Sequence, residues 1–463
     1  MTKASLTRRQ SLLLGSAALS AANLSGTHAL AATGSKPNTG TPHPDWAKNA
    51  TIYQINTRQF SQEGTFKAII PQLDRIKALG ASILWLMPIH EIGKVNRKGS
   101  LGSPYAVRDY YSVNPEFGTL EDFKALVQAA HDRGLKLIID WVANHTAWDN
   151  PLVSQHPEWY SRDHEGKMHP TLWLDWTDIV DLDYSQPGLR QYMADAMTYW
   201  VRDVGIDGFR CDVAHFVPIE FWEQARRQLD AVKPVFMLAE ADVRDVHYKA
   251  FSASYGWNWN NAMHNIAFGK ADCGALWGYY ADHRNIFPAS AMRMLHVSNH
   301  DQNAWEGTAY ERFGPATEAA VGLSVLGEGI PMIYNGQECG DPKRLAFFEK
   351  DPIVWKPHPM GDLYARMFAI KKANPALWNA PWGGLIAPVR HDQPKALFAF
   401  TRSVPGNRIM GLFNLSPQPL TATLNDAGIS GTWQDLLSGA RLSLKTGQTM
   451  TLPAWSWRGL KAV

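Results

Sequence analysis

The sequence predicts an α/β fold: a (β/α)8 barrel of the TIM type, with a loop domain inserted after its third strand and a C-terminal antiparallel β-sandwich domain. Three observations predict it. Apolar strand-like runs alternate with amphipathic helical stretches, which is typical of a parallel sheet covered on both faces. Acidic residues recur where these runs end. Towards the C-terminus the helical stretches stop and short strands follow one another.

The alternation of strands and helices begins after a Pro-, Gly- and Thr-rich linker at 35–45. Apolar runs with the length and composition of strands occupy 52–55, 83–87, 135–140, 208–212 and 235–240. Apolar residues at helical spacing occupy 66–79, 120–133 and 189–204, each followed by a glycine. We therefore expect repeated strand–helix units and a parallel sheet, either open or closed into a barrel.

The barrel is expected to span 32–384 and the C-terminal β domain 385–463. An insertion at about 145–183 is rich in Trp, His, Pro and Asp and has little periodicity. Long loops inside compact domains are usually functional, so this segment is expected to form a wall of a cleft. In the C-terminal domain, the residues Val404–Asn407 are typical of a turn between two strands.

Residues 1–31 are interpreted as a signal peptide. Lys3, Arg8 and Arg9 precede the apolar stretch 11–22, and Ala29–Ala31 resembles a cleavage site. The residues around the two arginines resemble a twin-arginine signal, and an ordinary Sec signal is the alternative. Export to the periplasm or the medium is expected, and the remaining sequence contains no apolar run long enough for a membrane anchor.

The charge balance argues against nucleic acid as a partner. The chain of 463 residues has 45 basic and 43 acidic side chains, a net charge of +2, whereas phosphate binding needs a clear basic excess. The 19 tryptophans are most simply explained as core residues, although such rings also stack on sugars. Cys211, Cys273 and Cys339 form no disulfide framework and are expected to be core thiols.

The acidic residues at the ends of strand-like runs are Asp140, Asp212, Glu240 and Asp301. In a barrel the C-terminal rim of the strands holds the active site. The spacing between these residues corresponds to one or two strand–helix units, so the carboxylates are expected to converge on one pocket. Arg210 and Asp212 should point to the same side of their strand. Such a pair can be structural or catalytic, and the spacing alone leaves both interpretations open.

Six stretches, in this order along the chain, resemble the α-amylase superfamily of glycoside hydrolases (family 13), of the bacterial α-amylase or α-glucosidase type. They are SPYAVRDY (103–110), DWVANH (140–145), GFRCD (208–212), the strand that ends at Glu240, SNHD (298–301) and GIPMIYNGQE (329–338). Each stretch alone is weak, but six in the family's order are specific. The resemblance covers nearly all of the chain after the signal segment.

The resemblance implies a role for each matched residue. Asp212 would be the nucleophile, Glu240 the acid/base, and Asp301 the residue that stabilises the transition state. Substrate-binding roles would belong to Tyr105, Asp140, His145, Arg210 and His300. The histidines outside these stretches, His90, His131 and His215, are expected to be packing groups.

The resemblance also raises the possibility of a structural Ca2+, because many family members hold one beside the inserted domain. Asn144 and Asp181 match two of its ligands. The family's third ligand is a histidine carbonyl, and Phe216 occupies that position here, with His215 one place early. No confident metal site and no required cofactor are therefore predicted.

The expected function is retaining hydrolysis of α-1,4-glucosidic bonds in starch or maltodextrins through a covalent glycosyl-enzyme intermediate. Val213 leaves α-1,6 cleavage open, because valine after the nucleophile favours that bond in related α-glucosidases. Transfer to another sugar or isomerisation is a second alternative, and a non-catalytic carbohydrate-binding relative is a remote one. The sequence leaves open exo or endo action and the oligomeric state.

Overall fold

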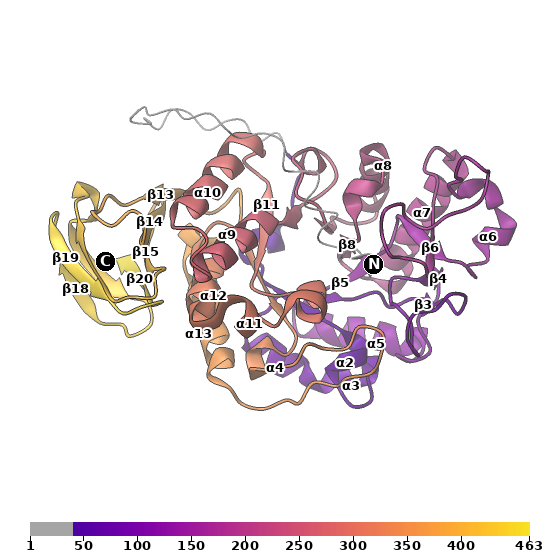
Figure 1. Ribbon diagram of the computed structural model, residues 1–463, viewed down its shortest axis with the longest axis horizontal. Helices are drawn as coiled ribbons and strands as arrows, with labels where there is room; N and C mark the ends of the chain where they lie inside the picture. The colour runs from indigo at the N-terminus through magenta and orange to yellow at the C-terminus, as the bar shows by residue number, and fades with distance from the viewer. Residues whose placement is uncertain (1–39) are drawn as a thin grey trace, which may run out of the picture.

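A computed structural model describes residues 40–463, so the predicted signal segment lies outside the described residues. Figure 1 shows the C-terminal β domain at one end of the barrel domain and the inserted segment around α6 and β6 at the other. Within the described part, no helix is both long and apolar enough to cross a membrane. The three cysteines are buried and form no disulfide, as expected.

Eight parallel strands form a closed barrel in the order β1-β12-β11-β10-β9-β8-β5-β2, which confirms the predicted fold. These strands are β1 (Ile52–Ile55), β2 (Ile83–Leu86), β5 (Lys136–Trp141), β8 (Gly208–Cys211), β9 (Phe236–Ala239), β10 (Ala253–Tyr255), β11 (Met292–His296) and β12 (Ile330–Tyr334). A separate core cluster, which includes Ile52, Trp85 and Phe236, draws its residues mainly from these strands. The strand β10 was not predicted, because a strand of three residues is too short to show a periodic pattern of apolar residues.

Most of the helices follow barrel strands. They are α2 (Thr57–Phe60), α3 (Phe66–Ile69), α4 (Leu73–Ala78), α5 (Leu120–Asp132), α7 (Pro187–Tyr199), α8 (Ile219–Asp230), α9 (Trp257–Ala267), α10 (Gly274–Ile286), α11 (Ala309–Phe313), α12 (Thr317–Leu326) and α13 (Pro359–Ala373). The helix expected over 66–79 is divided by a 3-10 turn at Ile70–Gln72. Pro71 lies in this turn and lacks the backbone N–H that a continuous α-helix would use.

The third barrel strand leads into the inserted segment. There β6 (His145–Ala147) pairs antiparallel with β7 (Ile179–Asp181), and the short helix α6 (Leu152–Gln155) lies between them in sequence. A small apolar cluster joins this hairpin to β3 (Glu91–Ile92) and β4 (Val107–Asp109). Because β6 follows the C-terminal end of β5, the insertion rises at the rim where the acidic residues lie.

The C-terminal domain contains a six-stranded antiparallel sheet, a two-stranded sheet and a shared apolar core. Its strands are β13 (Ile386–Pro388), β14 (Leu397–Val404), β15 (Asn407–Asn414), β16 (Leu420–Leu424), β17 (Gly431–Asp435), β18 (Arg441–Leu444), β19 (Gln448–Leu452) and β20 (Trp457–Ala462). Val404 pairs with Asn407 across the predicted turn. Buried Arg402 donates to the carbonyl of Gly327 at the end of α12, which fixes this domain to the barrel.

Candidate active site

Three of the four predicted acidic residues lie at the C-terminal ends of neighbouring barrel strands. Asp140 is the penultimate residue of β5, Asp212 follows β8 and Glu240 follows β9. All three are buried. Asp301 differs from the expectation, because it lies beyond the end of β11, directly before a π-helical turn at Gln302–Glu306. Its position depends on that loop rather than on the strand itself.

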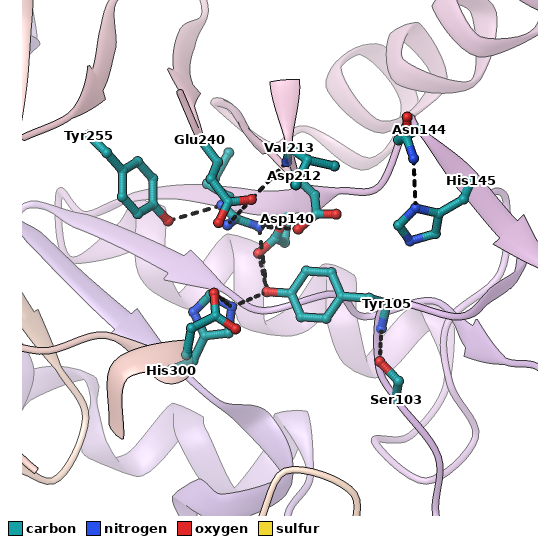
Figure 2. A network of polar contacts seen from close by, with 12 residues as sticks. Ser103, Tyr105, Asp140, Asn144, His145, Asp212, Val213, Glu240, Tyr255 and His300 are labelled. Carbon is teal, nitrogen blue, oxygen red and sulfur yellow. Dashed lines mark hydrogen bonds and ion pairs between the residues drawn. The ribbon is translucent and has the colours of Figure 1, made fainter. Parts of the chain in front are cut away.

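The buried guanidinium of Arg210 joins these carboxylates (Figure 2). Its Nη1 lies 2.7 Å from Oδ1 of Asp140 and 3.0 Å from Oδ1 of Asp212. Its Nη2 lies 2.9 Å from Oε2 of Glu240. One positive charge thus faces three acidic groups in a site of low dielectric, where the ionisation of each opposes that of the others.

The electrostatic consequence is clearest at Asp140. Burial raises the pKa of its carboxyl to about 7, although Arg210 acts in the opposite direction; the charges of Asp212 and Glu240 raise it further. A cluster of this kind retains a proton near neutral pH. Burial and the neighbouring acidic charges thus favour the protonated form of Asp140.

Glu240 is also held by the backbone that follows Asp212. The amide of Val213 donates a hydrogen bond to Oε2 of Glu240 at 2.7 Å (Figure 2). Val213 reaches this position with φ 35° and ψ 46°, in the left-handed region that β-branched residues rarely adopt. This contact could not be predicted from the sequence, because it depends on a backbone conformation.

Gly208 allows β8 and β9 to approach closely. A Cβ atom at this position would lie 1.9 Å from the carbonyl oxygen of Phe236, and the residue has φ 147°. Only glycine tolerates both conditions. The close approach brings Arg210 on β8 within reach of Glu240 after β9.

Tyr105 and His300 form a second part of the site (Figure 2). The Tyr105 hydroxyl lies 3.0 Å from Oδ2 of Asp140 and 2.6 Å from Nε2 of His300, and the two rings stack with 5.5 Å between their centroids. Nε2 of His300 lies 3.3 Å from Oδ2 of Asp301. Burial raises the pKa of Tyr105 well above its ordinary value, so its hydroxyl stays protonated and can donate to Asp140.

His145 lies at the start of the inserted segment. It is buried, with its Nδ1 3.2 Å from Nδ2 of Asn144 and its ring 5.7 Å from that of Trp176. Figure 2 shows the His145 ring beyond Asp212, on the side away from Tyr255. The predicted substrate-binding residues Tyr105, Asp140, Arg210 and His300 thus share direct contacts, and His145 flanks them.

Asn144 and Asp181, the two predicted calcium ligands, contact each other directly. Nδ2 of Asn144 lies 3.2 Å from Oδ1 of Asp181, and the hydroxyl of Thr171 donates to the same oxygen. Burial raises the pKa of Asp181 to about 6. Ca2+ needs six to eight oxygen ligands, whereas N–H and O–H donors face this carboxylate. The residues present therefore do not fit that ligand set, and residues 40–463 contain no cluster of three or more metal-ligating side chains.

Several site residues were missed by the sequence analysis. The hydroxyl of Tyr255 accepts a hydrogen bond from Nε of Arg210 at 3.1 Å, and Tyr255 lies on the unpredicted strand β10. Nε1 of Trp85 donates to Asp140 at 3.3 Å, and Nε2 of Gln54 lies 2.8 Å from Nδ1 of His300. Of these three residues, only Gln54 could have been found from the sequence, because it is a polar residue inside the apolar run 52–55.

The expectation for His215 was wrong, because its side chain is exposed rather than packed, with Nδ1 3.4 Å from the carbonyl oxygen of Glu240. His90 does pack among aromatic rings, including Trp141 and Trp200. His131 lies 2.7 Å from Asp207, in an ion-pair cluster before the start of β8.

A family model described as "Alpha amylase, catalytic domain" matches residues 38–170 and 155–356. Among curated proteins, the chain is 28% identical over 421 residues to alpha-amylase MalA of Haloarcula japonica, covering 86% of this chain and 59% of that protein. It is 30% identical to an alpha-1,4-glucan:maltose-1-phosphate maltosyltransferase of Rhodospirillum rubrum, covering 72% of this chain and 52% of that protein. The chain therefore spans little more than half the length of these two relatives.

Among solved structures, an alpha-amylase from Lactobacillus plantarum is 31% identical, with a TM-score of 0.80. A maltogenic alpha-amylase from Thermotoga neapolitana is 29% identical, with a TM-score of 0.81. In each comparison the match covers 90% of this chain and 99% of the other. The likeness thus includes the barrel, the inserted segment and the C-terminal β domain.

Proposed function

The chain belongs to the α-amylase family of glycoside hydrolases, and from this premise we propose that it hydrolyses α-1,4-glucosidic bonds of starch or maltodextrins with retention of configuration. The observation that carries the proposal is the shared guanidinium of Arg210. It holds Asp212 and Glu240 side by side, at 3.0 and 2.9 Å from its two terminal nitrogens. Retention requires such a close pair of carboxyl groups, about 5–5.5 Å apart, whereas inversion leaves room for a water molecule between them.

In the first step a carboxylate oxygen of Asp212 attacks the anomeric carbon. The bond from that carbon to the glycosidic oxygen breaks, and Glu240 gives its proton to the leaving oxygen. In the second step Glu240 takes a proton from water, and the oxygen of that water replaces Asp212 on the sugar. Arg210 donates a hydrogen bond to Oδ1 of Asp212 and thereby orients its carboxyl group.

The remaining residues would act on the sugar in the cleavage subsite. Tyr105 offers its ring as a stacking face, while His145 and His300 supply hydrogen bonds to sugar hydroxyls. Asp301 stabilises the positive charge that develops in the oxocarbenium-like transition state. Asp140 orients Arg210 and Tyr105, because it contacts both.

Transfer of the glycosyl group to another sugar is the second candidate, and the resemblance to a maltosyltransferase favours keeping it. Transfer and hydrolysis share every step up to the formation of the glycosyl-enzyme intermediate. α-1,6 cleavage also stays a candidate, because Val213 follows the proposed nucleophile.

A product profile separates these candidates. We expect maltoheptaose to yield shorter maltooligosaccharides whose newly formed ends have the α configuration by NMR. Transfer products that exceed hydrolysis products would favour the second candidate. Release of maltotriose from pullulan would favour α-1,6 cleavage, because pullulan consists of maltotriose units joined by α-1,6 bonds, and β-configured products would exclude retention.

The proposal extends to the cellular setting. We propose that the protein is exported to the periplasm or the medium, on the basis of the segment 1–31, and that it acts without a cofactor. Its partner would be an α-glucan. Nucleic acid is disfavoured by the net charge of +2. Cell fractionation, with N-terminal sequencing of the mature protein, tests the export.

A further inference from the structure

One buried side chain holds both ends of the loop that carries His300 and Asp301. This loop, residues 297–301, connects β11 to the π-helical turn at Gln302–Glu306. The side chain is that of Asn260, which lies inside α9 and is fully buried. Asparagine is unfavourable in the interior of a helix, and a buried amide group is costly unless it is hydrogen-bonded. The contacts of this amide group therefore decide what it contributes.

The two ends of the amide group of Asn260 contact the two ends of the loop. Its Nδ2 donates a hydrogen bond at 2.6 Å to the carbonyl oxygen of His296, the last residue of β11. Its Oδ1 accepts a hydrogen bond at 2.9 Å from Nε2 of Gln302, the residue directly after Asp301. One side chain thus fixes the distance between the start and the end of the loop.

Arg312 on α11 fixes the orientation of this amide group. Its Nη2 donates to Oδ1 of Asn260 at 2.7 Å, and its guanidinium also forms an ion pair with Glu306, the last residue of the π-helical turn. A flipped amide would place Nδ2 against two donors and Oδ1 against the carbonyl oxygen of His296. Arg312 and Gln302 are buried, so water does not compete for these hydrogen bonds.

Asp301 therefore lies between two neighbours that are both held in place. On one side, His300 is held from the barrel by Nε2 of Gln54 at 2.8 Å and by the hydroxyl of Tyr105 at 2.6 Å. On the other side, Gln302 is held by the amide group on α9. The strand β11 ends before this loop begins, so the strand itself does not place the carboxyl group.

We propose that Asn260 is a positioning residue for Asp301: it closes the loop 297–301 and so keeps Oδ2 of Asp301 beside His300, 3.3 Å from its Nε2. This inference rests on the proposed function, in which Asp301 stabilises the oxocarbenium-like transition state. Such stabilisation depends on a charge that is held in place before the reaction. A displacement of about 1 Å can cost a factor of about 100 in rate, even when the changed residue is far from the chemistry.

The first test compares Asn260→Ala and Gln302→Met with Asn379→Ala as the matched control. Asn379 is equally buried and donates to the carbonyl oxygens of Ala47 and Ala50, which precede β1 at the opposite end of the barrel. We expect Asn260→Ala to lower kcat for maltoheptaose about 10- to 100-fold with KM nearly unchanged, because Asp301 acts mainly on the transition state.

Gln302→Met breaks only one of the two contacts and should lower kcat in the same direction by a smaller factor. It also carries the test if Asn260→Ala does not fold. Asn379→Ala should lower the melting temperature and leave kcat unchanged. A lower melting temperature with unchanged kcat in the two loop variants would overturn the inference, because it would show a purely structural role.

A double-variant cycle tests whether Asn260 acts through Asp301. Maltotriosyl fluoride, an activated substrate, keeps the residual turnover of Asp301→Asn measurable. In that background Asn260→Ala should lower kcat no further, because the group that it positions is already lost. A fall by the same factor as in the wild type would show that Asn260 acts on the enzyme as a whole, and would overturn the inference.

Hydrogen exchange examines the loop without any substrate. Backbone amides in peptides that cover 296–307 should exchange faster in Asn260→Ala and Gln302→Met than in the wild type, and at the wild-type rate in Asn379→Ala. Unchanged exchange in both loop variants would refute the anchoring of the loop. If the wild type hydrolyses no glucan, the proposed function fails, and the exchange result still decides whether Asn260 holds the loop.

Discussion

The backbone amide of Val213 donates a hydrogen bond to Oε2 of Glu240 at 2.7 Å, from a left-handed conformation with φ 35°. Such a conformation costs on the order of 1–3 kcal/mol and persists only where the surrounding structure imposes it. The contact joins the residue after Asp212 to the proposed acid/base. The two proposed catalytic groups are thus positioned by one turn of backbone and by Arg210.

Glu240→Gln should abolish most of the turnover and leave glucan binding nearly intact. The amide oxygen of glutamine can still accept from Val213, but glutamine cannot exchange the proton. We expect kcat to fall by at least about 10²- to 10⁴-fold, the usual contribution of a general acid–base. Steady-state kinetics and calorimetry with maltoheptaose check this, with the melting temperature as the control for folding. Activity close to that of the wild type would refute the assignment of Glu240.

Asp212→Asn should prevent formation of the glycosyl-enzyme, because an amide is a poor nucleophile. Incubation with an activated fluorinated glucosyl donor should add one glycosyl group to the wild type and none to the variant, as measured by intact-protein mass spectrometry. Peptide mapping of the wild type should place the group on Asp212. An adduct on the variant, or on another residue of the wild type, would contradict the mechanism.

Asp140→Asn should change how stability depends on pH. Burial raises the pKa of Asp140 from 3.8 to about 7 in the folded protein, so the unfolded chain releases this proton first as the pH rises. The carboxyl group therefore contributes stability below pH 4, and the contribution is lost between pH 4 and 7. Asparagine carries no such proton. Between these pH values the wild type should lose on the order of 4 kcal/mol of stability relative to the variant.

Urea unfolding of both proteins at pH 5 and pH 8 measures this change. The difference in unfolding free energy between wild type and Asp140→Asn should move in favour of the variant at pH 8. A difference that stays constant with pH would show that Asp140 is ionised throughout.

Removal of divalent cations should leave the thermal stability of the protein nearly unchanged. The carboxylate of Asp181 is already bonded by Thr171 and Asn144, so it needs no ion to compensate it. Calorimetric scans with EDTA and with added CaCl2 should give the same Tm within a degree or so. A fall of several degrees with EDTA, restored by calcium, would establish a structural ion that these residues do not explain.

Gly208→Ala should destabilise the barrel strongly, by several kcal/mol, because its Cβ would overlap the carbonyl of Phe236. Gly134→Ala is the matched control. That glycine also has a positive φ, of 73°, but a Cβ there would meet nothing within 4 Å. Denaturant unfolding should show a clearly larger loss for Gly208→Ala, and equal losses would mean that backbone strain alone is responsible.

Local patterns in the chain were sufficient to predict a parallel sheet covered on both faces, and the acidic residues at the strand ends favoured its closure into a barrel. The runs 83–87 and 135–140 are apolar throughout, and a strand buried on both faces requires this composition. The carboxyl groups of Asp212 and Glu240 could be placed on one rim because parallel strands end at one edge of a barrel. The short strand β10 and the division at Pro71 were not predicted, because three residues show no periodicity and one proline gives only a weak local signal.

The sequence by itself thus determined the family, the parallel barrel and the side of it that carries the acidic residues, since these follow from residue identity and periodicity along the chain. The tertiary structure decided which groups touch. It placed Val213 against Glu240, Tyr255 against Arg210, and Asn260 against Gln302. These contacts join residues far apart in sequence through backbone angles and loop packing. No local pattern encodes them, because each depends on the closure of the whole barrel.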